Sequence, residues 1–214
     1  MEEKAFSVSM EKNPIITVKI IPGHFTTGNV HSNNFLDVGA LKSNARVAQD
    51  VARELAIPYL SSTLVDTIVC MERTEVIGAY LAEELLRAGT AVMNADSEIN
   101  VITPIINTNG NLVFQDNMVN MVSGKNIILI FASISSGRTL NNTIECLAYY
   151  GGKLAGISSL FVASLENQKH EIHTLFTAAD IPGYRIFPTS ECGMCKAGQK
   201  LDAIINSEGY TKIV

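Results

Sequence analysis

The sequence predicts an α/β fold with a central, mostly parallel sheet flanked by helices. Short apolar runs rich in Ile and Val alternate along the chain with stretches in which apolar residues recur every three or four positions. One run, residues 126–131, is nearly continuous Ile and Leu, which is typical of a parallel strand covered on both faces. The chain has 214 residues, of which 47% are hydrophobic, so it can bury a sizeable core without disulfides or metal.

The first elements are expected to be a strand, a loop and a helix. Residues 15–21 alternate partly between apolar and polar side chains, which predicts a half-buried strand. Residues 22–34 are rich in Gly, His, Thr and Asn and are expected to form a loop. Ser43 is a suitable helix N-cap, and Pro58 would end the helix. Its apolar face would carry Val47, Val51 and Leu55.

The middle of the chain predicts a buried strand, a helix and a hairpin. The strand is the apolar run 65–71. The helix ends at Gly89, and its apolar face carries Ile77, Tyr80, Leu81 and Leu85. Two extended runs between residues 101 and 114 flank Asn109-Gly110, a strong hairpin signal.

The second half continues the alternation after the central strand 126–131. A helix carries Leu140, Ile144, Leu147 and Ala148 inward and ends at Gly151-Gly152, and another strand runs over residues 154–162. Ligands of parallel sheets bind beyond the C-terminal ends of the strands. The turns at residues 70–75 and 131–139 are therefore the candidate sites.

Charge and cysteine content limit the class of protein. Sixteen Lys and Arg against twenty-one Asp and Glu give a net charge of −5, which argues against a broad nucleic-acid-binding surface. No apolar run approaches the length of a membrane-spanning helix, and the first residues show no secretory signal pattern. Four cysteines without such a signal indicate reduced thiols. We expect one cytoplasmic domain over residues 1–214, with no nucleic-acid or membrane partner.

The turn after the central strand has the chemistry of a phosphate-binding loop. Unpaired N–H groups at a helix N-terminus favour an anion. Ser135, Ser136 and Thr139 add hydroxyl donors, Gly137 permits close approach, and Arg138 adds positive charge. The alternative is an ordinary Ser- and Thr-rich helix cap.

Three segments carry a resemblance to a known family. Ile-Leu-Ile-Phe-Ala-Ser-Ile-Ser-Ser-Gly-Arg-Thr-Leu, residues 128–140, resembles the phosphoribosyl pyrophosphate (PRPP) signature of type I phosphoribosyltransferases. Residues 22–37 are similar to the N-terminal Gly-His-Phe segment of orotate phosphoribosyltransferases. Cys-Gly-Met-Cys-Lys-Ala-Gly, residues 192–198, is similar to the tail of some members. The segments follow the family's order over residues 20 to 200.

The resemblance implies a type I phosphoribosyltransferase-like fold, with a small hood made by the N-terminal segment and the C-terminal tail, and a homodimer. It implies transfer of ribose 5-phosphate from PRPP to a base, with orotate as the first candidate, and release of pyrophosphate with Mg²⁺. Ser135, Ser136, Gly137 and Thr139 match the loop that holds the 5-phosphate, and Arg138 stands where the family has a second glycine.

Three elements of the family's chemistry are altered. Phe131-Ala132 stands in place of the acidic pair that grips the ribose hydroxyls. The pyrophosphate loop contains Glu72, Arg73, Thr74 and Glu75, of which the last two replace glycines. Residues 91–124 contain no Lys or Arg, whereas the family has a basic lid there. A second hypothesis is therefore a non-catalytic module that binds PRPP or a ribose 5-phosphate nucleotide as a sensor or regulator.

Histidines and cysteines form two further groups. His24, His31 and Ser32 belong to the segment that resembles the family's substrate side, where they would contact a base or a phosphate or bond within a turn. The second group combines Cys192-x-x-Cys195 with His170-x-x-His173, which together make a possible Cys₂His₂ zinc set. Two surface histidines and a tight turn are the alternative for this set.

Overall fold

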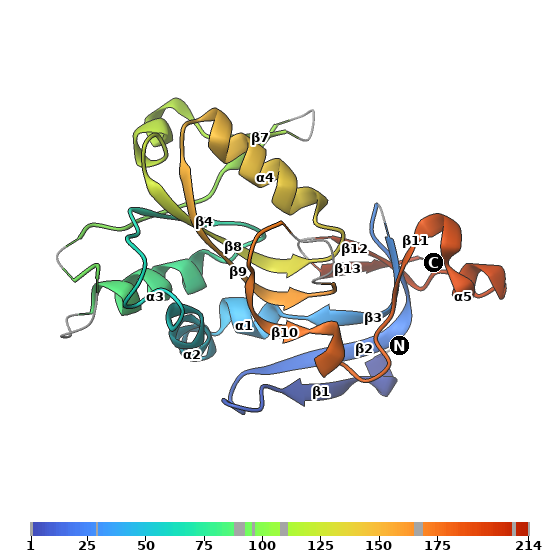
Figure 1. Ribbon diagram of the computed structural model, residues 1–214. Helices are drawn as coiled ribbons and strands as arrows, with labels where there is room; N and C mark the ends of the chain where they lie inside the picture. The colour runs from blue at the N-terminus through green and yellow to red at the C-terminus, as the bar shows by residue number, and fades with distance from the viewer. Residues whose placement is uncertain are drawn as a thin grey trace.

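Five parallel strands form the central sheet of the computed structural model, which describes residues 2–28, 30–87, 93–95, 97–107, 111–164, 169–206 and 209–213. Their order is β10 (His173–Thr177), β9 (Lys153–Val162), β8 (Asn126–Ile134), β4 (Thr67–Cys70) and β5 (Asn100–Ile102). Helices α2 (Ala45–Ala56) and α3 (Glu75–Leu86) cover one face, and α4 (Arg138–Tyr149) covers the other (Figure 1). The predicted parallel α/β architecture is confirmed.

The central strand β8 divides its side chains between two hydrophobic cores. Ile128 and Ile130 enter one core with α2, α3 and residues of the first strands of the chain. Ile127, Leu129 and Phe131 enter the other core with α4. All five side chains are completely buried. Burial on both faces explains why this run of the sequence lacks polar alternation.

A second sheet, which we call the hood, combines segments from both ends of the chain. Its order is β11 (Ile186–Pro188), β3 (Val30–Asp37), β2 (Thr17–Thr26), β12 (Ala203–Asn206) and β13 (Gly209–Lys212), and β1 (Phe6–Ser9) also pairs with β2. The two ends of the chain lie on the same side of the molecule (Figure 1). The hood implied by the family resemblance is therefore present as a sheet.

The remaining described elements are short. They are α1 (Gly39–Ser43), α5 (Gly193–Lys196), the antiparallel pair β6 (Ile105–Ile106) and β7 (Leu112–Val113), and the 3₁₀ helices η1 (Glu2–Lys4), η2 (Asp116–Met121), η3 (Ala178–Asp180) and η4 (Thr189–Glu191). Among the described residues, no helix combines the length and the apolar character that crossing a bilayer requires.

Residues 22–34 do not form the loop that their composition predicts. Strand β2 continues to Thr26 through a register shift between Pro22 and Phe25, and β3 begins at Val30. His24 and His31, which suggested a solvated loop, are buried at 0% and 5% exposure. Polar composition misleads here because these side chains bond to other segments of the chain.

Smaller differences concern element boundaries. Asn44, not Ser43, caps α2, because its side-chain oxygen accepts hydrogen bonds from the N–H groups of Arg46 and Val47. Ala148 is exposed rather than inward. The first predicted extended run splits into β5, which joins the parallel sheet, and β6, which pairs with β7. Gly89 and the Asn109-Gly110 turn lie outside the described residues.

Gly78 permits the close packing of α3 on β4, and its replacement tests that packing. A Cβ atom there would collide with the Cys70 sulfur and lie 3.1 Å from Val101 Cγ1. We expect Gly78→Ala to lower the free energy of unfolding by about 1–3 kcal/mol in denaturant titrations, although Ala is the better helix former.

Gly28→Ala is the matched control, because nothing lies within 4 Å of a Cβ at that position. A stability of Gly78→Ala equal to or above that of wild type would contradict this account of the α3–β4 contact.

Candidate functional site

The turn from β8 into α4 places the N-terminus of α4 at the edge of the parallel sheet. Gly137 has a φ of 73°, the left-handed conformation that glycine adopts without cost, and α4 starts at the next residue without a side-chain cap. The N–H groups of the first helical turn therefore lack protein partners within the helix. Ser136, Arg138 and Thr139 are exposed around them. This is the geometry of a helix N-terminus that accepts an anion.

A cavity of about 270 Å³ opens at this turn and brings three parts of the chain together. Its walls are the turn itself, the β4–α3 loop through Glu72, and the hood through Ser32, Asn34 and Asn206. The cavity includes all five residues that the sequence predicts for the phosphate loop: Ser135, Ser136, Gly137, Arg138 and Thr139.

A second cavity of about 600 Å³ adjoins the first. Glu72, Ser133 and Phe161 line both, so the two form one continuous cleft between the parallel sheet and the hood. The second cavity adds Lys42 from α1, Arg73 from the β4–α3 loop and Glu75, the first residue of α3. The two turns singled out in the sequence therefore meet in one cleft, whose size suits a small-molecule ligand.

The β4–α3 loop holds Glu72 and Arg73 in left-handed backbone conformations. Their φ angles are 55° and 63°, which is uncommon for residues with a side chain and is frequent at functional sites. The Lys42 ammonium group donates to the Glu72 carbonyl at 2.9 Å, and the buried Thr74 hydroxyl donates to the carbonyl of Met71 at 2.8 Å. These two bonds hold the loop in its strained form.

The Glu72 side chain reaches from the loop after β4 to the end of the neighbouring strand β8. Its Oε2 accepts a hydrogen bond of 3.0 Å from the Ser133 N–H group. Burial raises the pKa of this carboxyl group, while backbone hydrogen bonds from Ser133 and Ala132 and the charge of Lys42 act in the opposite direction. A carboxylate therefore lies beside the positions at which the sequence lacks the family's acidic pair.

The other residues of the predicted pyrophosphate loop have structural partners. Thr74 is completely buried and does not line the cleft. Glu75 Oε1 accepts a hydrogen bond of 2.9 Å from the Thr103 hydroxyl while it lines the second cavity. Phe131 and Ala132 are buried in the two hydrophobic cores, at 0% and 4% exposure.

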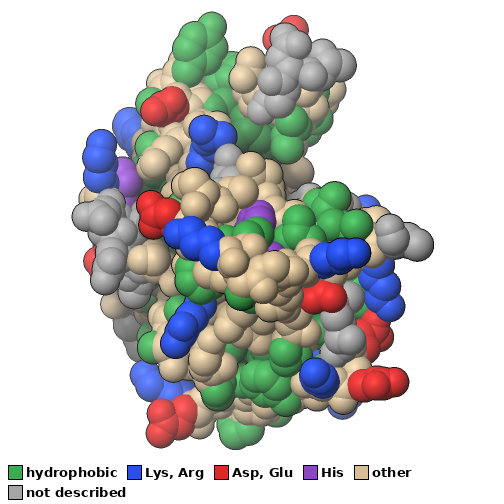
Figure 2. Space-filling model, turned by 90° about the vertical axis from the view of Figure 1, so that its right-hand side faces the viewer, with side chains coloured by type: hydrophobic (Ala, Val, Ile, Leu, Met, Phe, Trp, Pro, Cys, Tyr) green, Lys and Arg blue, Asp and Glu red, His purple; other side chains and the backbone are tan. Residues whose placement is uncertain are grey.

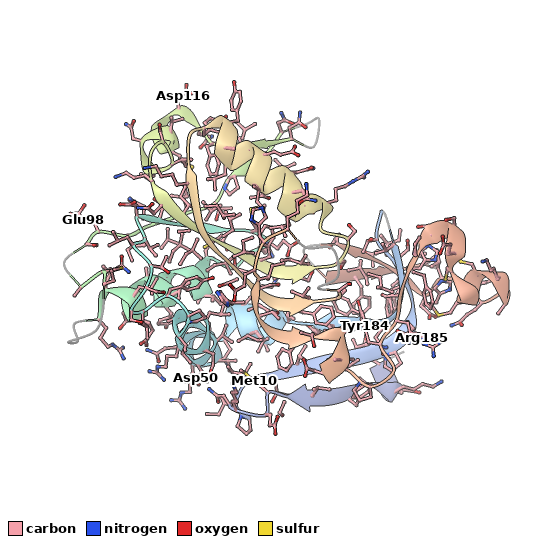
Figure 3. All side chains as sticks on the ribbon, viewed as in Figure 1. Met10, Asp50, Glu98, Asp116, Tyr184 and Arg185 are labelled. Carbon is pink, nitrogen blue, oxygen red and sulfur yellow. The ribbon has the colours of Figure 1, made fainter. Side chains whose placement is uncertain are left out.

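The sequence did not single out several residues of the cleft. Tyr184 lies between the two sheets (Figure 3), packs edge-to-face on Phe161 at 5.2 Å and lines the first cavity. Burial raises the Tyr184 pKa to about 12, so the phenol is neutral and can donate a hydrogen bond. Lys42 and Asn34 were also missed, because no local motif marks a residue whose role depends on the meeting of two sheets.

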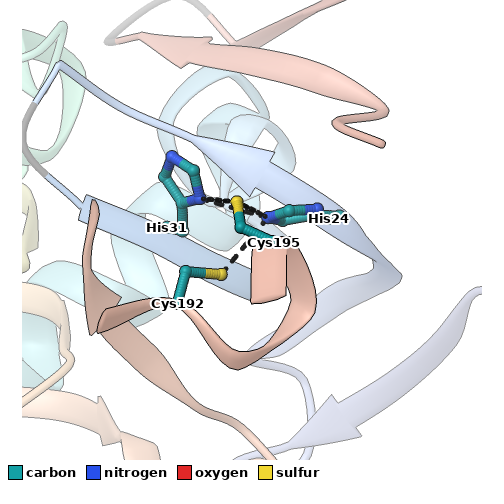
Figure 4. Close-up of side chains that lie close together, drawn as sticks. All are labelled: His24, His31, Cys192 and Cys195. Carbon is teal, nitrogen blue, oxygen red and sulfur yellow. Dashed lines mark hydrogen bonds between the residues drawn. The ribbon is translucent and has the colours of Figure 1, made fainter. Parts of the chain in front are cut away.

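The predicted substrate-side histidines face a different group. The His24 and His31 side chains lie against the Cys192 and Cys195 sulfurs (Figure 4), and the four candidate ligand atoms lie within 4.8 Å of one another. Ser32, the third residue predicted for this segment, does line the cleft, and its hydroxyl donates to the Asn34 carbonyl at 2.9 Å.

The structure corrects the histidine pair predicted for the zinc set. His170 is exposed, and His173 packs edge-to-face on Tyr59 at 5.2 Å and lies 3.9 Å from a Glu171 carboxylate oxygen. Neither belongs to the group around Cys192 and Cys195. Closeness in sequence selected the wrong pair, since the β2–β3 hairpin brings the more distant pair to the cysteines.

Solved structures that are similar to this fold include phosphoribosyltransferases. A phosphoribosyltransferase from Corynebacterium diphtheriae has a TM-score of 0.50 and 13% identity, over 75% of this chain and 89% of its own. Adenine phosphoribosyltransferase from Thermoanaerobacter pseudethanolicus has a TM-score of 0.53 and 15% identity, over 75% of this chain and 95% of its own. UMP synthase from Leishmania donovani has a TM-score of 0.53 and 18% identity, over 75% of this chain and 34% of its own.

No protein-family model matches the sequence, and a sequence search of curated proteins finds no match. The similarity to solved structures therefore concerns the fold. Since identities this low do not carry functional residues from one chain to another, the function has to be argued from the residues of the cleft.

Glu72→Gln tests the electrostatic environment of the cleft. Because burial raises the pKa of Glu72, the carboxyl group holds its proton more tightly in the folded protein than in the unfolded chain. The protonated carboxyl group therefore contributes stability below the pKa of the unfolded chain, and this contribution is lost as the pH rises through the higher pKa of the folded state. We expect E72Q to unfold at a higher temperature than wild type at neutral pH, with the difference shrinking toward about pH 4.

Glu98→Gln is the control, because Glu98 is exposed and lies away from the cleft (Figure 3). A stabilisation of E72Q that does not change with pH would contradict the raised pKa.

Proposed function

We propose that this chain, which has the type I phosphoribosyltransferase fold, binds PRPP in the cleft and transfers its ribose 5-phosphate group to a base. The observation that carries this proposal is the continuous cleft, which joins the turn at residues 135–139 to Glu72 and to the hood. An anion site, a carboxylate and a larger adjoining cavity are the features that a sugar bearing one phosphate and one pyrophosphate requires.

The 5-phosphate binds at the N-terminus of α4. Backbone N–H groups of the first helical turn donate to its oxygens, and the helix dipole adds a partial positive charge. The hydroxyl groups of Ser136 and Thr139 and the Arg138 side chain surround this point. Gly137 leaves room for the phosphate because it has no side chain.

The ribose hydroxyls bind at Glu72. Ser133, whose N–H group holds the Glu72 carboxylate, lies near the end of β8, shortly before the turn at residues 135–137 that leads into α4. A carboxylate there accepts hydrogen bonds from the hydroxyls and stabilises positive charge on the sugar as the bond at C1 breaks. Glu72 therefore replaces the acidic pair from the loop that follows the neighbouring strand β4.

The pyrophosphate occupies the second cavity beside Lys42, Arg73 and Glu75. In the reaction the bond from C1 of the sugar to the pyrophosphate oxygen breaks, and pyrophosphate leaves with the electron pair. A ring nitrogen of the base forms the new bond to C1 and releases its proton to solvent.

Mg²⁺ fits this cavity chemically, because it prefers carboxylate and phosphate oxygens. Glu72 and Glu75 are the carboxylates that would hold it, and when bound it would neutralise charge on the leaving group.

A second candidate function is binding without turnover, in which the cleft senses PRPP or a ribose 5-phosphate nucleotide. The burial of Phe131 and Ala132 at the family's acidic positions favours it. So does the absence of Lys and Arg from residues 91–124 of the sequence, because a basic lid would supply charge to the leaving group.

Pyrophosphate release from PRPP with Mg²⁺ separates the two functions. We expect release that depends on an added base, with orotate tested first and other bases as a panel. Calorimetric titration with PRPP is run in parallel. Binding without release for every base would establish the second candidate, and the absence of both would contradict the proposed site.

Ser136→Ala tests the phosphate site itself. Loss of one hydrogen bond to a charged ligand is expected to weaken binding of ribose 5-phosphate about 10- to 100-fold in calorimetry. Ser62→Ala, which removes an exposed hydroxyl outside the cleft, should bind like wild type. Equal affinity of S136A and wild type would place the phosphate elsewhere.

Glu72→Gln tests the replacement of the acidic pair by comparing turnover with binding. The amide keeps the hydrogen bond from Ser133 but loses the negative charge, so we expect the rate of transfer to fall by about 100-fold or more. Affinity for ribose 5-phosphate should fall by less than the rate does, because the phosphate site at α4 is unchanged. A rate equal to that of E98Q would show that Glu72 has no part in the transfer.

A further inference from the structure

Four side chains outside the cleft converge on one point. The His24 Nε2 atom lies 3.1 Å from His31 Nδ1, 3.4 Å from the Cys192 sulfur and 3.7 Å from the Cys195 sulfur (Figure 4). The Cys195 sulfur is also 3.3 Å from His31 Nδ1. His24, His31 and Cys192 are almost completely buried, and Cys195 is exposed.

Hydrogen bonding among these groups does not account for the convergence. The other ring nitrogen of His24, Nδ1, lies 3.0 Å and 3.2 Å from the carbonyl oxygens of Gln199 and Lys200. Since a carbonyl oxygen can only accept, Nδ1 carries the proton and Nε2 presents a lone pair. One lone pair accepts one hydrogen bond, yet His31 Nδ1 and the sulfurs of Cys192 and Cys195 all lie within 3.7 Å of this nitrogen.

A metal ion at the centre accounts for all the contacts at once. Zinc takes ligands at about 2.0–2.1 Å for His nitrogen and 2.3 Å for Cys sulfur in a tetrahedron. These bond lengths place neighbouring ligand atoms about 3.3 to 3.8 Å apart. The four distances given above, 3.1 to 3.7 Å, lie close to this range.

The surroundings of the group are those of a structural metal site. The carbonyls of Gln199 and Lys200 fix the tautomer and orientation of His24, as the outer partners of metal-bound histidines commonly do. Two thiolates and two imidazoles are the donors of a closed, four-coordinate zinc site, which leaves no position for a substrate. The exposure of Cys195 provides the path by which the ion enters.

We propose that His24, His31, Cys192 and Cys195 bind one Zn²⁺ ion that fastens the β2–β3 hairpin to the C-terminal segment. Two hydrogen bonds also join these segments. The His24 N–H group donates to the side-chain oxygen Asp202 Oδ2 at 2.7 Å, and the Asp202 N–H group donates to the His24 carbonyl at 2.8 Å. Two residues that line the cleft lie along the same segments: Ser32 directly follows His31 on β3, and Asn206 ends β12 further along the C-terminal segment. Zinc therefore holds one wall of the cleft in place.

The face of the molecule that carries α5 has no dominant charge. Figure 2 shows this side of the molecule, where basic and acidic side chains are scattered and a small area of histidine surface appears near the centre. Because no broad charged patch is visible on this face, a local ligand is a better explanation of the buried histidine–cysteine group than a large charged partner.

Metal analysis of the full chain, purified from zinc-supplemented medium under reducing conditions, tests the proposal. We expect about one zinc per chain, and Co²⁺ substitution should give the sulfur-to-cobalt charge-transfer band and the intense visible bands of a tetrahedral thiolate site. Protein without metal and without these bands, iron in place of zinc, or a Cys192–Cys195 disulfide under these conditions would overturn it.

Two pairs of variants locate the ligands. His31→Ala and Cys195→Ser should lose most of the bound metal, whereas His170→Ala and Cys146→Ser should retain it, because His170 and Cys146 lie outside the group. Zinc retained by Cys195→Ser, or lost equally by the control variants, would contradict the assignment.

Hydrogen exchange of the wild-type chain gives a readout that does not depend on variants or on activity. Removing the metal with a chelator should speed exchange in residues 24–32 and 192–202 and leave the amides of β8 unchanged. Unchanged exchange in the hood after complete metal removal would overturn the structural role.

Discussion

Burial of β8 on both faces is the constraint on which the rest of the structure depends. Its side chains enter the α2–α3 core and the α4 core in strict alternation, so the strand cannot shift register without moving apolar groups into the wrong layer. Strands β4 and β9 take their positions from it on either side. The strand also ends at a defined place, and the turn through Gly137 then presents the N-terminus of α4 at the edge of the sheet. The position of the anion site therefore follows from the packing of the core.

The hood supplies what the parallel sheet lacks, which is the second wall of the cleft. It is built from residues near both ends of the chain, and its packing on the main core runs through Ile16, Val18 and Ile20. The β4–α3 loop lines the cleft and places the Glu72 carboxylate beside Ser133 on the neighbouring strand β8. In the proposed function, Glu72 takes the place of two neighbouring acidic residues on one strand. Its position depends on a hydrogen bond between segments about sixty residues apart.

The sequence predicted the elements whose evidence is local and missed those whose evidence is not. Apolar periodicity located β4, β8, β9 and the three long helices, and the small residues after β8 marked the turn that lines the cleft. Composition predicts a loop over residues 22–34, where the structure has the end of β2 and most of β3, because the polar side chains there are satisfied by partners more than 150 residues away. The histidines beside Cys192 and Cys195 were misassigned for the same reason. The sequence places Glu72 in the pyrophosphate loop, but the position of its carboxylate depends on a left-handed backbone that no propensity predicts.

A crystal structure of the full chain with ribose 5-phosphate would test the central claim most directly. This account predicts the phosphate at the N–H groups of residues 137–139 and the ring hydroxyls within hydrogen-bond distance of the Glu72 carboxylate. A sugar phosphate bound outside the cleft, or bound in it with the ring turned away from Glu72, would contradict the account.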